Sequence, residues 1–161
     1  MVELVRVHEI DRPALWALVD EYLLELANHR EIPVGPTTAA DYRYLPAYWS
    51  EPGRHPFFVT RSGERVGFLL VREVPVEGVI QMSDFYVQPT SRRSGIGREA
   101  LELVFRRFPG AWELQVHRRN RPGLAFWSRS LEALCPGPIR VAEVVEEDGR
   151  RMQYNFDAGG A

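Results

Sequence analysis

The residues most able to do chemistry lie in the run DFYVQPTSRRSGIGR, residues 84–98. A strand-like segment enters a short loop, and Gly95 and Gly97 stand where an amphipathic helix begins. Free N–H groups at a helix N-terminus bind phosphate oxygens, and glycines leave room for their approach. Three arginines add positive charge: Arg92, Arg93 and Arg98. The run predicts a site for a phosphate-bearing ligand, although two glycines at a helix start are also typical of an ordinary turn.

The common nucleotide-binding motifs do not fit this run. A dinucleotide-binding fold needs GxGxxG after its first strand, whereas this glycine pair lies past mid-chain and residue 100 is Ala. A P-loop needs a lysine, and all 20 basic residues counted as Lys+Arg are arginines. Both nucleotide-binding interpretations are therefore rejected. The arginine bias itself is typical of a GC-rich genome.

Composition indicates one globular domain over residues 1–161. Hydrophobic residues make up 45% and charged residues 26%, and the net charge is −2. This balance argues against nucleic acid or an acidic membrane surface as a partner. Cys135 is the single cysteine, which excludes an internal disulfide and a cysteine-based zinc site, so we expect no metal. Without a signal-like N-terminus or a long apolar run, we expect a cytoplasmic protein.

Periodicity and turn residues predict the elements that position the run. Residues 2–8 alternate as a strand, and apolar spacing from Asp11 to His29 indicates a helix. Two prolines make Glu31 to Pro36 a loop, and a second helix is predicted from about Thr38 to Trp49. The remaining predictions are strands over 57–60, 66–71 and 79–87, a helix from Gly95 to Phe108, a strand over 112–116, a helix over 122–134, and strands over 139–145 and 152–156 around a turn at 148–149. The order β-αα-βββ-α-β-α-ββ predicts an α/β fold, a mixed sheet of about seven strands flanked by about four helices.

Two motifs in this order resemble the GNAT (general N-acetyltransferase) superfamily. Arg92-x-x-Gly95-x-Gly97 fits its central Arg/Gln-x-x-Gly-x-Gly/Ala motif. Asn120 followed by Phe126-Trp127 is similar to its Asn-x-x-Ala-x-x-Phe-Tyr segment. The likeness spans nearly the whole chain, and it is greatest to small bacterial predicted acetyltransferases that share the Phe-Pro-Gly-x-Trp-Glu run at 108–113. It implies a bacterial N-acetyltransferase that moves an acetyl group from acetyl-CoA to a primary amine by direct attack in a ternary complex.

The resemblance also implies a cofactor site. The loop and helix start would hold the pyrophosphate through backbone N–H groups. In the preceding strand, the backbone of Phe85 and Val87 would bind pantetheine and the thioester carbonyl, stabilising the oxyanion. Asn120 would reach the pantetheine, or cap its own helix, or both. The implied cofactor-binding residues are Phe85, Tyr86, Val87, Arg92, Arg93, Ser94, Gly95, Ile96, Gly97, Arg98, Asn120, Phe126 and Trp127.

Catalytic residues are less clear. Asp84 lies nearest the expected thioester and is a candidate general base, or else a solvated or salt-bridged strand carboxylate. Alternation puts it on the opposite face from Phe85 and Val87, unless a bulge re-aims it. Relatives often carry a glutamate base earlier, where Gln81 stands, and a tyrosine acid where Trp127 stands. Indole cannot deliver a proton, so Trp127 packs against the cofactor or the thiolate leaves unaided. The weak substitute acids are Ser128 and Tyr86.

The acceptor is not identified by the sequence, nor is the length of the acyl group. Family resemblance implies pocket-lining residues in the early helices and the final hairpin, and it makes a homodimer through the C-terminal strands plausible. The candidates are Tyr22, Glu25, His29, Tyr42, Tyr44 and Trp49, all of which could instead be core or surface residues. Glu21 and Glu25 could pair with a cationic amine or face water. The alternative function is a catalytically silent domain that binds acyl-CoA as a sensor; a nucleic-acid-binding domain is poorly supported.

Overall fold

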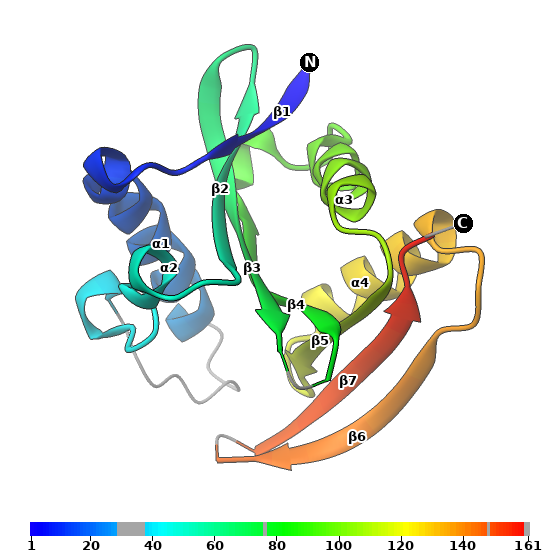
Figure 1. The fold of residues 1–161 in the computed structure, drawn as a ribbon. Helices are drawn as coiled ribbons and strands as arrows, with labels where there is room; N and C mark the ends of the chain where they lie inside the picture. Colours follow the sequence, from blue (N-terminus) through cyan, green and yellow to red (C-terminus); the bar gives the residue numbers. More distant parts are fainter. Residues whose placement is uncertain (29–37, 76, 148, 160–161) are drawn as a thin grey trace.

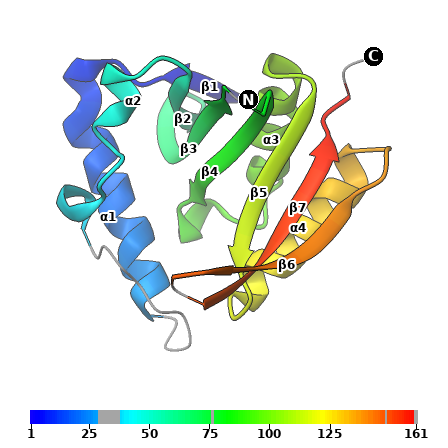
Figure 2. The ribbon, with the colours of Figure 1, turned by 60° about the horizontal axis from the view of Figure 1, so that its bottom comes forward.

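The computed structural model describes residues 1–28, 38–75, 77–147 and 149–159. Seven strands form one sheet in the order β1-β2-β3-β4-β5-β7-β6. Neighbouring strands are antiparallel except β4 and β5, which are parallel and are joined through a helix. The strands are β1 (Val2–Arg6), β2 (Arg54–Arg61), β3 (Glu64–Val74), β4 (Val79–Val87), β5 (Ala111–His117), β6 (Arg140–Glu146) and β7 (Gly149–Asp157). β1 and β6 form the two edges (Figure 2).

In the described residues four α-helices cover the sheet, and Figure 1 shows α1 and α2 on one side and α3 and α4 on the other. They are α1 (Arg12–Asn28), α2 (Ala47–Ser50), α3 (Ile96–Arg107) and α4 (Arg121–Leu134). Each face has its own core. Leu15, Val19 and Leu23 of α1 pack with Phe68 and Leu70, while α3 and α4 pack on a cluster around the fully buried Trp112. This mixed sheet with two helical layers confirms the predicted fold class.

Local sequence explains where α3 and α4 begin. Gly95 precedes α3 with a φ of 82°, a left-handed conformation that glycine adopts without strain. Glu99 lies in the first turn of α3 and Arg106 and Arg107 in its last, which matches the helix dipole. The Asn120 side chain accepts a hydrogen bond from the Gly123 N–H at 3.0 Å and so caps α4.

The predicted second helix, from about Thr38 to Trp49, is wrong over most of its length. The segment forms a 3₁₀ turn at Ala39–Asp41, an irregular stretch, and then only the four residues of α2. Pro46 has no N–H and its ring disfavours helical backbone in the preceding residue, so a continuous helix cannot form here. Tyr42 is left in an extended conformation. The predicted loop over 31–36 and His29 lie outside the described residues.

A bulge in β4 changes which side chains face which helices. Leu70 of β3 pairs with Asp84 and the next residue, Val71, pairs with Met82, so Ser83 is an extra residue in β4. Met82 faces the core beneath α3 and α4, whereas Asp84 contacts tyrosines on the α1 side. Phe85 again faces α4, so Asp84 lies on the opposite face from Phe85, as alternation predicts.

Candidate active site

The parallel strands β4 and β5 pair over only a short distance. Ladder pairs join Ile80 to Trp112 and Gln81 to Glu113, and β4 then continues to Val87 with no described partner on this side. The bulge at Ser83 follows directly, where the ladder ends. In the second half of β4, the backbone groups on the side of β5 are therefore unpaired, although β4 is an inner strand of the sheet. Such an edge can bind an extended chain as an added strand would.

The loop after β4 brings a helix N-terminus to this edge. Arg93 has a φ of 64° and Gly95 one of 82°, so the chain turns sharply before α3. The N–H groups in the first turn of α3 have no helical acceptor by position, and they carry the positive end of the dipole. Arg93, Ser94 and Arg98 are exposed, whereas Ile96 is buried in the core beneath. This arrangement suits a phosphate-bearing ligand.

Gly97 packs closely against aromatic side chains. A Cβ at this position would lie 3.3 Å from Cε1 and 3.4 Å from Cζ of Phe126, and 3.7 Å from Cζ of Phe85. Phe85, Phe126 and Trp127 form one aromatic group, with ring centroids 5.3–5.7 Å apart. The start of α3 therefore rests on this aromatic group, and four of the predicted cofactor-binding residues do lie together.

The Arg92 guanidinium forms hydrogen bonds with other groups of the protein. Its Nε donates to the Val87 carbonyl at 2.8 Å, and its Nη2 donates to Glu25 of α1 at 2.7 Å. Hydrogen bonding to Glu25 is the main reason that the pKa of Arg92 is raised. The guanidinium thus ties the loop to the end of β4 and to α1, and it holds the loop in place.

Asp84 lies at the centre of a group of tyrosines on the α1 side of the sheet. Tyr22 of α1 donates its hydroxyl to Asp84 Oδ1 at 3.0 Å, and Tyr42 donates to Oδ2. Among the described residues the carboxylate forms no ion pair within 4 Å, although Arg151 is near enough to lower its pKa. Asp84 is therefore a hydrogen-bonded, half-buried carboxylate, and not a solvated or salt-bridged one.

Burial raises the pKa of Asp84 to about 6, even though the hydrogen bonds from Tyr42 and Tyr22 act in the opposite direction. The same burial, together with Asp84, raises the pKa values of Tyr22 and Tyr42 well above their usual range, so both stay protonated as donors. A carboxylate that titrates near neutral pH is suited to general-base catalysis.

A cavity of about 350 Å³ opens beside this group. Its lining includes Tyr42, Tyr44 and Tyr48 from the segment between α1 and β2, and Ser83, Gln115 and Arg151 from three strands. The sequence predicted Tyr42 and Tyr44, and it predicted a contribution from the final hairpin without naming Arg151; it missed Ser83 and Gln115. Alternation along β5 and β7 could have found Gln115 and Arg151, because they face away from the core that Trp112 and Tyr154 occupy.

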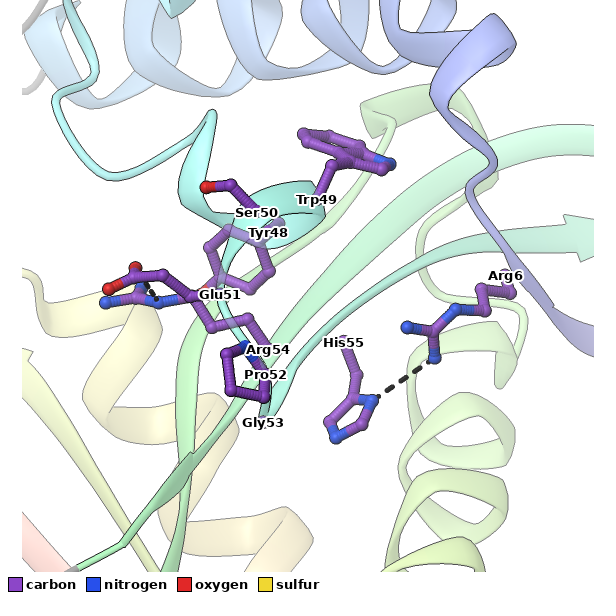
Figure 3. A pocket seen from close by; sticks show the side chains of 9 residues that line it. All are labelled: Arg6, Tyr48, Trp49, Ser50, Glu51, Pro52, Gly53, Arg54 and His55. Carbon is purple, nitrogen blue, oxygen red and sulfur yellow. Dashed lines mark hydrogen bonds and ion pairs between the residues drawn. The ribbon is translucent and has the colours of Figure 1, made fainter.

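Other candidates lie away from the carboxylate. Trp49 donates its indole N–H to the Val7 carbonyl at 3.1 Å and lines a separate hollow, where Arg6 and His55 meet (Figure 3). Tyr86 bonds Glu21, and burial raises its pKa to about 12, so it is a poor acid. Ser128 pairs with the Tyr154 hydroxyl at 3.2 Å on the other face of the sheet.

Neither a metal site nor a membrane helix is found in the described residues. No group of three or more His, Cys, Asp or Glu side chains is arranged to hold a metal ion there. In the part of the chain that is described, no helix has the length and apolar character needed to cross a membrane.

Comparison with known proteins agrees with this geometry. The model of the acetyltransferase (GNAT) family matches residues 17–132. An acetyltransferase structure from Thermus thermophilus has 20% identity and a TM-score of 0.69, covering 98% of this chain and 97% of that one. The ribosomal-protein-S18-alanine N-acetyltransferase from Escherichia coli has 17% identity and a TM-score of 0.64, covering 100% of this chain and 96% of that one.

A third solved structure holds ligands. Spermidine N-acetyltransferase from Vibrio cholerae, in complex with CoA and spermine, has 10% identity and a TM-score of 0.69, covering 98% of this chain and 95% of that one. A search of curated protein sequences found no match. Because the family model covers most of the chain, the chain belongs to the GNAT acetyltransferase family, which confirms the resemblance.

Proposed function

We propose that this protein is an acetyl-CoA-dependent N-acetyltransferase that transfers the acetyl group to a primary amine by direct attack in a ternary complex. One observation carries the proposal. The unpaired edge of β4 lies between a glycine-rich helix start, suited to phosphate, on one face and a carboxylate with a pKa of about 6 on the other. Cofactor and acceptor can therefore approach the same few backbone atoms from opposite faces of the sheet.

The cofactor side fits acetyl-CoA as a substrate. The backbone of Phe85, Tyr86 and Val87 would pair with pantetheine, and N–H groups from Arg92 to Arg98 would bind the pyrophosphate. A backbone N–H of this part of β4 would donate to the thioester carbonyl oxygen, where negative charge develops during attack. The Asn120 amide oxygen is engaged in its cap, which leaves its NH₂ group for the pantetheine.

The acceptor side would carry out proton transfer. The amine lone pair forms the new N–C bond, the C–S bond to CoA breaks, and the amine loses a proton. Asp84 would take this proton either directly or through Tyr42. In the second case the Tyr42 hydroxyl would accept the amine proton and pass its own proton to the Asp84 carboxylate. Tyr42 lines the cavity and bonds Asp84, so it is suited to such a relay.

No proton donor for the leaving thiolate is assigned. Trp127 is 9% exposed, and its ring centroid lies 5.7 Å from that of Phe85. Its role would be packing on the cofactor side of the sheet. A thiol with a pKa near 8.5 is a tolerable leaving group without side-chain help.

Calorimetry with acetyl-CoA, followed by a CoA-release assay with a panel of amines, tests the proposal. We expect micromolar binding to the wild type, and loss of binding in the Arg92→Ala, Gly97→Glu double variant. Arg106→Ala is the matched control, because that side chain is 75% exposed at the far end of α3. Failure of the wild type to bind would refute the proposal. Binding without CoA release from any amine would instead support the silent, acyl-CoA-sensing domain.

A further inference from the structure

The cavity beside Asp84 has a charge pattern that bears on the acceptor. Its volume of about 350 Å³ lies at the small end of the range for small-molecule sites. Arg54, Arg72 and Arg151 line it, and no aspartate or glutamate is found among its described lining residues. A polyamine acceptor would bring several ammonium groups against these arginines, which like-charge repulsion opposes.

The three arginines differ in their partners. Arg54 donates its Nε to Glu51 at 3.0 Å, and its side chain is 11% exposed between the rings of Tyr44 and Tyr48. Arg151 interacts electrostatically with Asp84. Arg72, from β3, forms no ion pair within 4 Å in the described part of the chain; it interacts electrostatically with Glu113, which accepts a hydrogen bond from Gln81. Arg72 can thus offer its guanidinium fork to a carboxylate.

A second, independent feature also points to a missing polar group. Tyr48 is 3% exposed, lines the cavity, and its hydroxyl has no hydrogen-bond partner among the described residues. Burial raises the pKa of Tyr48 to about 12; Ser83 and Arg54 lower it only in part, and neither forms a hydrogen bond with the hydroxyl. A buried hydroxyl left unpaired is costly, so a ligand oxygen at this position would relieve the cost.

One negative group lies next to the cavity lining. Tyr42 lines the cavity and donates to the Asp84 carboxylate, which is where the proposed function needs the amine. A ligand that fills the cavity therefore meets the Tyr42 hydroxyl that bonds the Asp84 carboxylate, together with guanidinium groups and the unpaired Tyr48 hydroxyl.

We infer that the acceptor is a small zwitterion, an amine that also carries a carboxylate, of about the size of an amino acid or a dipeptide. Arg72 and Tyr48 bind the carboxylate, and the amine lies against Tyr42, whose hydroxyl bonds Asp84. This inference rests on the proposed function, because it names the acceptor class of the same site.

Paired acceptors that differ only in the carboxylate test this inference, for example lysine against cadaverine and phenylalanine against phenethylamine. We expect kcat/KM to be at least about tenfold higher for the carboxylate member, as one charge-assisted hydrogen bond would give. Arg72→Gln should abolish this preference through KM, with acetyl-CoA affinity unchanged. Arg140→Gln, an exposed arginine of β6, is the matched control.

Product binding supplies a readout without turnover. N-acetylated amino acids should bind the wild type more tightly than N-acetylcadaverine, and Arg72→Gln should remove the difference. Equal or greater activity with cadaverine, a preference that survives Arg72→Gln, or no binding of N-acetylated amino acids would each overturn the inference. Acetyl-CoA binding distinguishes the two failures: if it persists, the acceptor class is wrong, and if it is absent, the proposed function is wrong as well.

Discussion

At the residue scale, the pKa of Asp84 depends on its two tyrosine donors. Burial raises its pKa to about 6, and the hydrogen bonds from Tyr42 and Tyr22 lower it from a still higher value. Tyr42→Phe removes one of these bonds, so the pKa of Asp84 should rise. A base is inactive when protonated, and the acidic limb of the kcat–pH profile should therefore move to higher pH.

Steady-state kinetics from pH 5 to 9 would measure this shift. Tyr44→Phe is the control, since Tyr44 is 52% exposed and is not among the hydrogen-bond partners of Asp84. Asp84→Asn should lower kcat by roughly 10²–10⁴-fold, the usual contribution of a general base. An acidic limb that stays in place in Tyr42→Phe, or full activity in Asp84→Asn, would show that another group takes the proton.

The contact between Arg92 and Glu25 gives a second prediction at this scale. If Arg92 acts by tying the loop to α1, Glu25→Gln should weaken acetyl-CoA binding by up to about fivefold, the range of a partly exposed ion pair. If Arg92 instead acts on phosphate, Glu25→Gln should leave affinity unchanged or raise it. Calorimetry decides between these outcomes, with Glu102→Gln, whose arginine partner is 3.9 Å away at the other end of α3, as the control.

At the scale of elements, α3 is positioned by a glycine that touches an aromatic group. Gly97→Ala adds a methyl that meets the Phe126 ring at 3.3 Å, while an alanine inside a helix gains up to about 1 kcal/mol over glycine. We expect overall stability to change little. The N-terminus of α3 should shift, and the Kd for acetyl-CoA should rise roughly tenfold, as overpacking of about 1–3 kcal/mol would cause.

Urea unfolding and calorimetry on the same variant would separate the two effects. Gly137→Ala is the comparison, because nothing lies within 4 Å of the added Cβ. Unchanged acetyl-CoA affinity in Gly97→Ala would mean that α3 does not need this contact to hold the cofactor.

At the scale of the whole molecule, the buried carboxylate costs stability. The pKa of Asp84 rises from 3.8 to about 6 on folding, so between these values the folded state binds more protons than the unfolded state. Its contribution to the free energy of unfolding therefore falls as pH increases from about 4 to about 6, and stays low above. Asp84→Asn should remove this slope.

Urea unfolding of wild type and Asp84→Asn at pH 4 and pH 7 checks the linkage. Relative to the wild type, the variant should gain roughly 1–3 kcal/mol between the two pH values. Glu113, whose pKa is also raised by burial, is present in both proteins and cancels in the comparison. The same difference at both pH values would mean that Asp84 is ionised freely in the folded state.

A homodimer through the C-terminal strands stays a prediction.

Sequence alone determined the elements with strong local signals. Apolar spacing located α1, α3 and α4, the glycines and Asn120 located helix starts, and the two motifs predicted the family. These patterns involve residues only a few positions apart, so they can be recognised without knowledge of the tertiary structure. The one long error was the second helix, where Pro46 outweighed a helical pattern.

Only the tertiary structure decided the site beyond the cofactor loop. Tyr22, Tyr42 and Asp84 meet from a helix, an irregular segment and a strand, and the bulge at Ser83 determines which face of β4 the carboxylate shares with them. The Arg92–Glu25 pair and the arginine-lined cavity likewise join residues far apart in the chain. Sequence periodicity cannot predict such long-range contacts, because they depend on the order of the strands in the sheet and on where the β4–β5 ladder ends.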